Sequence, residues 1–599
     1  MGDFFLDLGP RESRPLGRVA ERLRFVDDTS CVVVDERRFG VVVAYTGDAA
    51  LWAPYRGKDE VFVAVAGRPV FDQAEWEDDR LERAAGGLAS QILHGRYEQH
   101  GLSGLATLNG SCAAIVCDVP RGLVHLVTDC GGAFPAFEYV SARGVTYCSH
   151  PDVLAESVGE THRLDEISLV EFGLTGTVTP PFSYYERIRA ADHGTIFTVD
   201  LKQPGAPQPV KRRHFHIVPR IDRGVSDEEL AGDLAAAVRR AVKRRTWGGL
   251  GPAAIGLSGG LDSRAIAACA EPSPGTFAFC CYDESNREFR VAQTVARSLA
   301  MPFLPVRRGC DYYADHAELG VRISGGMGSF ANNHFLGAMP SLTAAGMRNL
   351  VTGCYCDYLF KGLPLDRHTS WPWGRETLAP YRHQFYFEHY ASSTSLAGQA
   401  RERWESRIPL EFRHHGSVES VFHLEAGRTF PLSYEGDNQQ RLVPQRVTGW
   451  CPPFVDRDVL DVYCRVPYQA KLNRSLFRNA VSLIDPRLTR IIDANTGARP
   501  DASLLKETVS RNALRLQRRL RGLGQSLWSD GSWPNWKSYV VRSPKLAALW
   551  ERPNPDAMDF FRRAFGPENV EARVGAYTGD RAFLLVQLLT LKLWLDQCR

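Results

Sequence analysis

The chain of 599 residues is predicted to be an α/β protein in two parts, a β-rich first third and a longer second part built on a parallel sheet. Two observations predict this class. In the first third, short apolar segments follow one another and are separated by turn residues. Beyond residue 212, short apolar strands alternate with helical patterns, which is typical of a parallel sheet covered on both faces. From about residue 365 to the end, the pattern is mainly helical.

Composition and charge narrow the function classes before any motif is considered. Hydrophobic residues make up 44% and charged residues 24%, so the chain can bury substantial cores. The 72 basic and 69 acidic residues nearly balance, which argues against nucleic acid as a partner. The longest apolar stretch, residues 583–595, is shorter than the roughly 20 residues of a membrane span, so we expect a cytoplasmic protein. The 14 cysteines are too sparse for a disulfide scaffold.

The elements of the first part are predicted in chain order from apolar runs and turn residues. A helix is predicted over residues 80–100, where apolar residues recur at helical spacing. Residues 201–209 contain three prolines and a glycine, which break regular structure, so this segment is the predicted linker. We therefore expect one domain over residues 1–212 and a second over residues 213–599. The predicted strands are Cys31–Val34, Gly40–Tyr45, Val61–Val65, Cys112–Asp118, Leu123–Thr128 and Thr195–Val199.

The second part is predicted to begin with a helix and to continue as a βαβα series. Ser226 and Glu229 have the spacing of a capping box, so a helix is expected to begin there and to run to about Arg245. The elements that follow are a strand over residues 252–257, a helix over 262–269, a strand over 275–281 and a helix over 288–299.

The loop between the first of these strands and its helix carries chemistry. Its two glycines allow close approach of the backbone, and the helix start presents N–H groups to an anion, so the loop is predicted to bind phosphate. Ser258 and Ser263 add hydroxyl donors, and the Asp262 carboxylate suits Mg²⁺, which prefers hard oxygen ligands. The loop lacks the Gly-Lys-Ser/Thr ending of a Walker loop. Its residues are Leu257, Ser258, Gly259, Gly260, Leu261, Asp262 and Ser263.

A second loop with a carboxylate follows a later strand. Gly353 and Asp357 come after the apolar segment that begins at Leu350. A Ser-Gly-Gly loop by itself is most simply an ordinary strand-to-helix turn. Here, however, the two loops are expected to meet at the carboxyl edge of a parallel sheet, where these folds bind ligands. We therefore predict a nucleotide site that includes Gly353, with Asp262 and Asp357 as catalytic residues and as ligands of Mg²⁺.

These motifs resemble those of the asparagine synthetase-like amide synthetases. The pyrophosphatase loop of that family reads Ser-Gly-Gly-x-Asp-Ser, as residues 258–263 do, and its second loop reads Gly-x-x-x-Asp, as Gly353 and Asp357 do. Residues 128–135 and 149–154 are similar to segments of the family's glutaminase domain. The resemblance implies an Ntn-type glutaminase β-sandwich with αββα layers, followed by a PP-loop parallel-sheet domain with a helical C-terminal extension. It also implies ATP and Mg²⁺ as cofactors.

The sequence differs from the family at the nucleophile that hydrolyses glutamine to ammonia. Working glutaminases of this type carry Cys at position 2, where the N-terminal amine activates its thiol, but this chain has Gly2. We therefore expect an inactive glutaminase-like domain and an amine that the substrate itself supplies. Two branches of the family lack the cysteine, the β-lactam-forming synthetases and the lasso peptide cyclases, and both close a ring within one substrate.

Between these branches, the length of the C-terminal helical part favours the lasso peptide cyclase. The resemblance then implies that an Asp or Glu side chain of a leader-free core peptide is adenylated and attacked by the peptide's N-terminal amine, which forms a macrolactam and releases AMP and pyrophosphate. A leader peptidase and a leader-recognition protein are implied partners. A small-molecule amide or β-lactam synthetase and a catalytically silent binding protein stay open as alternatives. An arginine-rich helix either contacts peptide or partner or is a solvated face, and it carries Arg511, Arg515, Arg518, Arg519 and Arg521.

Further catalytic residues follow from the resemblance alone. β-Lactam-forming relatives use a Tyr–Glu pair for the amine proton, and the candidates here are Tyr355 and Glu388. Tyr355 lies two residues before Asp357 rather than three, and Glu388 is alternatively a carboxylate on a helix surface. The late Lys of those relatives has no counterpart before Lys506, so oxyanion stabilisation is expected from Mg²⁺, backbone N–H groups or an arginine.

Overall fold

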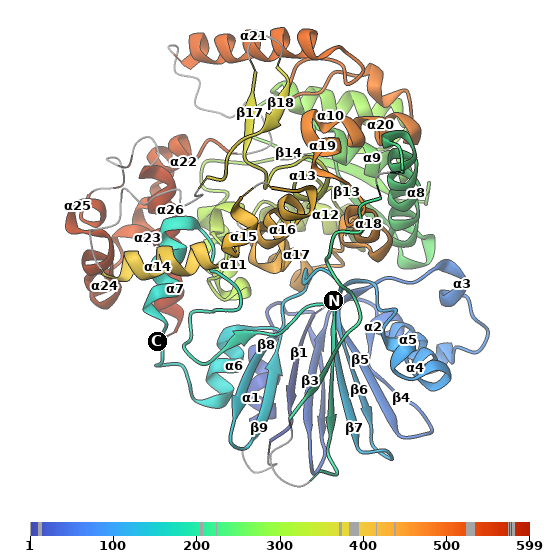
Figure 1. Ribbon diagram of the computed structural model, residues 1–599. Coiled ribbons are helices and arrows are strands. Elements are labelled where there is room, and N and C mark those ends of the chain that lie inside the picture. Colours follow the sequence, from blue (N-terminus) through green and yellow to red (C-terminus); the bar gives the residue numbers. More distant parts are fainter. Residues whose placement is uncertain are drawn as a thin grey trace.

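The computed structural model describes residues 2–9, 15–203, 208–222, 224–370, 374–382, 395–414, 416–435, 439–522, 534–572, 574, 577 and 581–598. In the view of Figure 1, a layered β structure forms the lower half of the molecule, and a mainly helical body around a small sheet forms the upper half. The C-terminus returns to the side of the β structure (Figure 1). Within the described residues, no helix has the length and apolar character needed to cross a bilayer.

Two six-stranded antiparallel sheets form the first part, and all six predicted strands are present in them. The first sheet has the order β10 (Arg189–Ala190), β8 (Phe137–Ser141), β9 (Gly144–Cys148), β1 (Gly2–Asp7), β3 (Gly40–Tyr45) and β2 (Ser30–Asp35). The second has the order β12 (Val210–Arg213), β11 (Thr195–Asp200), β7 (Leu123–Thr128), β6 (Gly110–Asp118), β5 (Val61–Pro69) and β4 (Tyr55–Arg56). Because β12 pairs with β11 as far as Arg213, the second sheet extends just past residue 212.

The two sheets pack face to face because side chains alternate between the faces of each strand. On β1, Phe4 and Leu6 belong to the core between the sheets, whereas Phe5 belongs to the core on the outer face. The second sheet contributes Phe62 and Ile115 to the same inner core.

Helices cover both outer faces, so the layers run helix, sheet, sheet, helix. The helices on the first sheet are α1 (Leu16–Arg22), α6 (Pro151–Val158) and α7 (Glu166–Thr175). The second sheet carries α4 (Leu88–His100), with the short helices α2 (Ala49–Trp52), α3 (Gln73–Trp76) and α5 (Leu102–Leu105) beside it in Figure 1.

The helix predicted over residues 80–100 is wrong in its first half. The helix α4 begins only at Leu88, after Gly86 and Gly87, whose φ angles of 72° and 67° lie in the left-handed region. Glycine reaches this region without steric cost, so the chain turns here before the helix begins.

A four-stranded parallel sheet lies at the centre of the second part, as predicted. Its order is β15 (Phe303–Arg307), β14 (Phe277–Tyr282), β13 (Ala253–Gly256) and β16 (Asn349–Val351). The helices α8 (Asp227–Thr246), α9 (Leu261–Cys269) and α10 (Arg287–Ser298) complete the predicted series, and Ser226 and Glu229 form the predicted capping box of α8. Further helices of this part are α11 (Ala317–Ser324), α12 (Met339–Ala344), α13 (Cys356–Phe360), α14 (Ser395–Ser406), α15 (Leu410–Arg413), α16 (Val418–Thr429), α17 (Gln439–Val447), α18 (Arg457–Tyr463), α19 (Tyr468–Lys471) and α20 (Ser475–Ile484).

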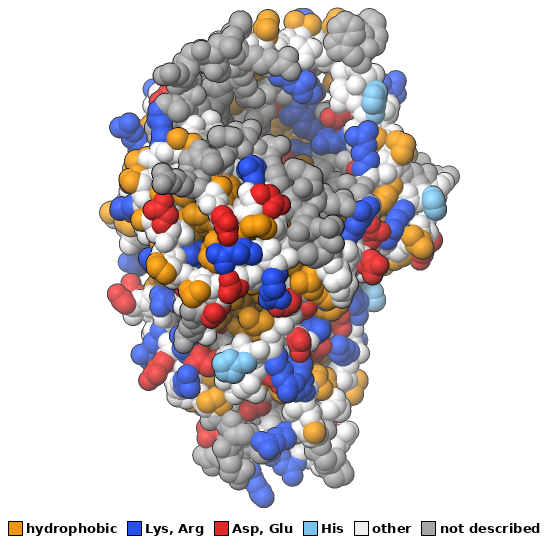
Figure 2. All heavy atoms as spheres, turned by 90° about the vertical axis from the view of Figure 1, so that its left-hand side faces the viewer, with side chains coloured by type: hydrophobic (Ala, Val, Ile, Leu, Met, Phe, Trp, Pro, Cys, Tyr) orange, Lys and Arg blue, Asp and Glu red, His pale blue; other side chains and the backbone are white. Residues whose placement is uncertain are grey.

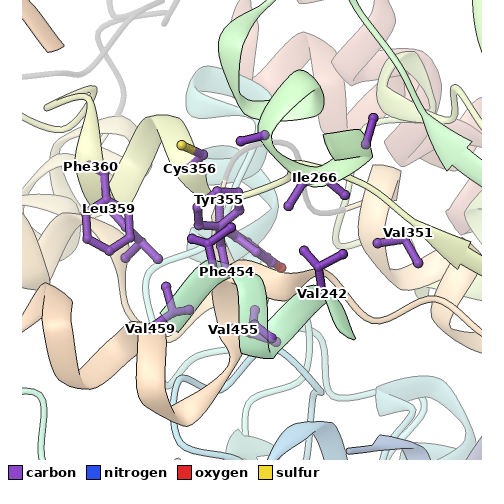
Figure 3. Packing of buried hydrophobic residues seen from close by; sticks show 14 of the residues in the cluster. Val242, Ile266, Val351, Tyr355, Cys356, Leu359, Phe360, Phe454, Val455 and Val459 are labelled. Carbon is purple, nitrogen blue, oxygen red and sulfur yellow. The ribbon is translucent and has the colours of Figure 1, made fainter. Parts of the chain in front are cut away.

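One hydrophobic core joins the parallel sheet to its helices. Figure 3 shows Val242 of α8, Ile266 of α9, Val351 of β16 and Phe454 in this core. Helices cover the sheet on both faces, so its strands are apolar without a strict alternation.

The C-terminal helices tie the two parts together. The last helix, α26 (Arg581–Gln597), shares a hydrophobic core with the outer face of the first sheet. Its Trp594 ring lies 4.6 Å from that of Tyr184, between ring centroids. The other elements here are α21 (Leu504–Gly522), α22 (Trp536–Arg542), α23 (Pro544–Glu551), α24 (Pro555–Phe565) and α25 (Pro567–Val570), and the hairpin of β17 (Arg367–Thr369) and β18 (Glu376–Leu378) lies below α21 in Figure 1.

A buried ion pair also crosses the junction between the two parts. The Arg446 guanidinium of α17 donates through Nε to Asp3 Oδ1 of β1 at 2.8 Å, and the two side chains are 2% and 1% exposed. Arg446 also donates to the carbonyl oxygens of Ser149 and Ile323. One guanidinium thus connects β1, the turn after β9 and the end of α11.

Acidification is expected to destabilise the protein through His125. This side chain of β7 is 1% exposed, and burial lowers its pKa to about 4. The folded state then binds fewer protons than the unfolded state, so its contribution to stability is present above pH 6.5 and is lost as the pH falls towards 4. The loss approaches roughly 3 kcal/mol for this histidine. The measurement is the unfolding free energy from pH 7 to pH 4.5 for the wild type, for His125→Gln and for His100→Gln at an exposed position of α4. If the unfolding free energy falls with pH by the same amount in all three proteins, the prediction for His125 is wrong.

Candidate active site

The predicted nucleotide loop lies at the carboxyl edge of the parallel sheet, where it lines a cavity. The cavity has a volume of about 450 Å³. Its walls come from the loops after β13, β15 and β16, from β14 and the first turn of α10, and from the segment around Asn495. On the face of the molecule that Figure 2 shows, a hollow at the height of β14 and the β17–β18 hairpin is bordered by Lys and Arg side chains.

The loop after β13 is held in shape by its own serines. The hydroxyls of Ser258 and Ser263 are hydrogen bonded at 2.8 Å, and the Gly260 N–H donates to Ser258 Oγ at 3.1 Å. Gly260 is the N-cap of α9 and has extended backbone, so the first turn of the helix follows directly. The loop therefore presents the amino end of α9, together with two hydroxyls, at the cavity where an anion can bind.

Two glycines are required by close packing rather than by backbone angles. A Cβ atom on Gly259 would lie 2.3 Å from Ala494 Cβ, and one on Gly353 would lie 3.1 Å from Asp262 Cβ and 3.2 Å from the Ser263 nitrogen. Gly259 thus lets residues 493–497 pack onto the loop, and Gly353 lets the second loop pack onto the first turn of α9.

Substitution of Gly259 is expected to weaken nucleotide binding. In Gly259→Ala the new methyl group meets Ala494, so residues 493–497 must shift away from the loop. We expect a stability loss of about 1–3 kcal/mol, as for other overpacked sites, and a weaker affinity for ATP. The matched control is Gly309→Ala after β15, where a Cβ meets nothing within 4 Å. Calorimetric unfolding and ATP titration of both variants test this, and equal behaviour of the two would contradict it.

The two predicted aspartates are brought together by a lysine. Asp262 is in the first turn of α9 and Asp357 in the first turn of α13. Lys361 Nζ lies 2.8 Å from Asp262 Oδ1 and 2.8 Å from Asp357 Oδ1. The side chains of Asp262, Asp357 and Lys361 are 19%, 54% and 11% exposed, so the ammonium is the most enclosed group of the three.

The charges of these three groups are strongly coupled. Burial raises the pKa of Asp262, and the nearby Lys361 only partly offsets this. Burial also acts to raise the pKa of Asp357, but Lys361 lowers it below its ordinary value. Burial alone would lower the pKa of Lys361, and the two carboxylates raise it instead. The lysine is therefore a permanent positive charge at neutral pH.

The donor set fits magnesium that arrives with a polyphosphate. Asp262 and Asp357 supply hard oxygen atoms from two loops at the same edge of the cavity. Among the described residues, no group of three or more His, Cys, Asp or Glu side chains could hold a metal by itself. One or two carboxylates completed by phosphate oxygens and water are typical ligands of Mg²⁺ in nucleotide sites.

A buried polar network lies behind the loops of β14 and β15. The Arg308 Nε atom lies 2.8 Å from Asp283 Oδ1, and both side chains are 1% exposed. Tyr539 of α22 donates to the same Asp283 oxygen at 2.8 Å. Arg308 and His334 line the cavity, and Tyr313 contacts both of them. The C-terminal helices thus support the wall of the cavity, which the sequence pattern did not predict.

The segment of residues 493–497 closes the cavity from the other side. Buried Arg264 of α9 donates to the carbonyl oxygen of Ile491 at 2.9 Å and to that of Gly259 at 2.8 Å. Arg474 pairs with Asp493 at 2.9 Å. These arginines position Asn495, which lines the cavity.

The two remaining candidate residues are Tyr355 and Glu388, and the structure describes only Tyr355. Tyr355 has a left-handed φ of 75° at the N-cap of α13, is 2% exposed and packs against Trp450 in the hydrophobic core, where Figure 3 shows it beside Phe454. Tyr355 also contributes to the cavity wall, but the tyrosine of this loop with a partly exposed side chain is Tyr358. Glu388 lies outside the described residues.

Position 2 has no room for a side chain. Gly2 is paired with Tyr45 in the first sheet and has a φ of 123°. A Cβ atom there would lie 1.8 Å from the Ala44 carbonyl oxygen. In this conformation, residue 2 therefore cannot present a nucleophilic side chain.

Sequence reasoning missed Lys361, Arg308 and Asn495. A signal existed for Lys361, because it follows Asp357 by four residues, at the C-cap of the short helix α13, and such pairs meet on one helix face. Arg308 and Asn495 reach the cavity only through the packing of distant segments, so spacing along the chain carries no signal for them.

The comparisons with known proteins agree with this geometry. Residues 233–562 match the family model of asparagine synthase, and this span is more than half of the chain. The chain belongs to the asparagine synthase family. Over 211 residues it is 27% identical to the carboxyethyl-arginine β-lactam-synthase of Streptomyces clavuligerus, and the match covers 34% of this chain and 36% of that protein, so only about a third of that relative is spanned.

Two solved structures align over larger parts of the chain, but with low scores. The allosteric regulatory enzyme of purine biosynthesis covers 51% of this chain and 80% of its own, at 11% identity and a TM-score of 0.25. The glutamine phosphoribosylpyrophosphate amidotransferase from B. subtilis, complexed with ADP and GMP, covers 73% of this chain and 95% of its own, at 10% identity and a TM-score of 0.26. Scores of this size carry no argument about function.

Proposed function

We propose that this protein joins a carboxyl group to an amine at the expense of ATP, with AMP and pyrophosphate as products. The observation that carries the proposal is that Asp262, from the glycine-rich loop at the start of α9, and Asp357, from the second loop, both contact Lys361. Membership of the asparagine synthase family supports the same chemistry. The proposed roles are nucleotide binding by residues 257–263 and Gly353, and ligation of Mg²⁺ by the two aspartates.

The proposed reaction has two steps. A carboxylate oxygen of the substrate attacks the α-phosphorus of ATP, and the bond between that phosphorus and the bridging oxygen breaks, so pyrophosphate leaves. The amine nitrogen then attacks the acyl carbon, the bond to the AMP oxygen breaks, and the amine loses a proton. Magnesium, when bound, neutralises charge on the phosphates. The Ser258 and Ser263 hydroxyls and the amino end of α9 hold the departing phosphates in place.

We infer that the amine belongs to the substrate itself. Gly2 offers no nucleophile for glutamine hydrolysis, and its surroundings admit no side chain. The substrate class we propose is a leader-free core peptide, whose N-terminal amine attacks an adenylated Asp or Glu side chain to form a macrolactam, as in lasso peptide cyclases. Ring closure within one molecule needs no supply of ammonia. The enzyme must instead hold the amine and the activated carboxyl group of the same peptide close together. A leader peptidase and a leader-recognition protein are the proposed partners.

A peptide series tests this function. The peptides are synthetic, and each has a free N-terminal amine and a single acidic residue. The position of the acidic residue differs from one peptide to the next. Each peptide is incubated with the protein, ATP and Mg²⁺. We expect AMP and pyrophosphate to form only with a subset of them, together with a product that has lost one water. N-acetylated peptides are the control, and they are expected to support adenylation without ring closure. Release of ADP and phosphate would contradict the mechanism.

A small-molecule amide or β-lactam synthetase is the second candidate, and the match to a β-lactam-synthase favours it. It is distinguished by pyrophosphate release with free amino acid derivatives and not with peptides. A catalytically silent binding protein is the third candidate, and isothermal titration that detects no binding of ATP with Mg²⁺ would favour it.

A further inference from the structure

Lys361 occupies the position between the two carboxylates of the nucleotide site. Its Nζ atom is 2.8 Å from one oxygen of Asp262 and 2.8 Å from one oxygen of Asp357, so a single cation bridges the two loops. The side chain is 11% exposed and lines the cavity. Its Nζ atom also lies 5.5 Å from the centroid of the Phe477 ring, on the side of α20.

A bridging lysine offsets the electrostatic repulsion between two neighbouring carboxylates. Asp262 and Asp357 repel each other when both are ionised, and the cost is greatest for Asp262, whose side chain is only 19% exposed. A metal that arrives with the nucleotide cannot neutralise them beforehand. An ammonium at hydrogen-bond distance from both keeps the two loops together in the absence of nucleotide.

The same lysine cannot keep both contacts once a metal is bound by these carboxylates. Two cations would then share the same oxygen atoms at contact distance. A lysine has a flexible stem with rotatable donors, so its ammonium can turn to other acceptors without movement of the backbone. The acceptors that enter the cavity at that moment are phosphate oxygens, because residues 258–263 direct them to the same edge.

We propose that Lys361 is a resident cation of the nucleotide site, which holds Asp262 and Asp357 together before ATP binds and then turns to the phosphate oxygens. This inference rests on the proposed function, because it takes a nucleoside triphosphate as the ligand. It assigns Lys361 a direct contact with the substrate. It also makes two predictions of opposite sign for one substitution, which an ordinary structural salt bridge does not make.

The test compares Lys361→Met and Lys361→Arg with the wild type and with Lys506→Met, an exposed position on α21. The first measurement titrates Mg²⁺ alone into nucleotide-free protein, and the second titrates ATP in the presence of EDTA. In Lys361→Met we expect Mg²⁺ to bind at least tenfold more tightly, because its competitor for the carboxylates is gone. We expect metal-free ATP to bind at least tenfold more weakly, because a positive charge near the phosphates is lost. Lys361→Arg should retain most of the affinity for ATP, and Lys506→Met should behave as the wild type.

Each result decides the proposal. If Lys361→Met folds, as judged by its melting temperature, and either the Mg²⁺ affinity or the metal-free ATP affinity is unchanged, the proposal is overturned. If Lys361→Met is unstable, the titrations of Lys361→Gln decide in the same way, since glutamine also lacks the positive charge but keeps a hydrogen-bond donor. If the wild type binds no ATP with or without Mg²⁺, the proposed function itself fails. A wild type that binds ATP beside an unaltered Lys361→Met overturns only the role of the lysine.

Discussion

Replacement of Asp262 or Asp357 by asparagine is expected to lower pyrophosphate–ATP exchange by a factor on the order of 10²–10³ or more. Asparagine keeps the shape of each side chain and removes its charge, which a magnesium ligand must supply. The two aspartates come from separate loops and meet only at Lys361, so neither can replace the other. The measurement is the exchange rate with saturating substrate, with Mg²⁺ varied.

The controls for this prediction separate charge from folding. Asp501→Asn removes a carboxylate that is 45% exposed and pairs with Arg499 in the same part of the chain, and we expect no change in exchange. The melting temperatures of Asp262→Asn and Asp357→Asn should stay near that of the wild type or rise slightly, because Lys361 keeps one carboxylate in each variant. Exchange that survives in both aspartate variants would remove the basis of the proposed function.

Much of the fold could be predicted from the sequence, because most of its elements have strong local signals. The capping box of Ser226 and Glu229 marks the start of α8, and the glycine-rich loop after β13 marks the start of α9. Strands such as β3 and β7 are apolar runs between turn residues, and the structure has them at the predicted bounds. These signals depend on neighbouring residues, so no tertiary information is needed to read them.

Elements that depend on distant partners could not be predicted in the same way. The strand β1 contains two aspartates in six residues, and it is a strand because it lies between β3 and β9. The late helix α22 supports the cavity wall through Tyr539, which meets Asp283 some 250 residues away in the chain. Local periodicity contains no information about such contacts.

The residues of the candidate site also fall into two classes, those with a local sequence signal and those that depend on distant partners. The loop of residues 257–263 and the pair of Asp262 and Asp357 follow from motifs that a general fold rule places at one sheet edge. Lys361 was within the second motif but had no assigned role, and its importance is visible only when the distance to Asp262 is known. Arg308 belongs to the same class, since its partners Asp283 and Tyr313 come from other loops.

The β structure of the first part packs against the second part. Its outer face shares a hydrophobic core with α26, and position 2 is the first residue of β1, paired with Tyr45 of β3. An electrostatic link adds to this core, because Arg446 and Asp3 are 2.8 Å apart and nearly without solvent contact. A buried pair of this kind is costly to break from one side, since the remaining charge stays buried without its partner.

Arg446→Ala is therefore expected to destabilise the protein by about 3–5 kcal/mol. The substitution leaves the Asp3 carboxylate unpaired at 1% exposure and removes donors from the Ser149 and Ile323 carbonyl oxygens. The matched control is Arg563→Ala, because Arg563 also joins the two parts through Glu166, but that pair is 61% and 43% exposed. Its loss should cost no more than about 1 kcal/mol. Chemical unfolding of both variants measures the difference. Equal costs would show that the junction does not depend on the buried pair, and a double variant with Asp3→Asn should recover part of the stability, because it removes the uncompensated charge.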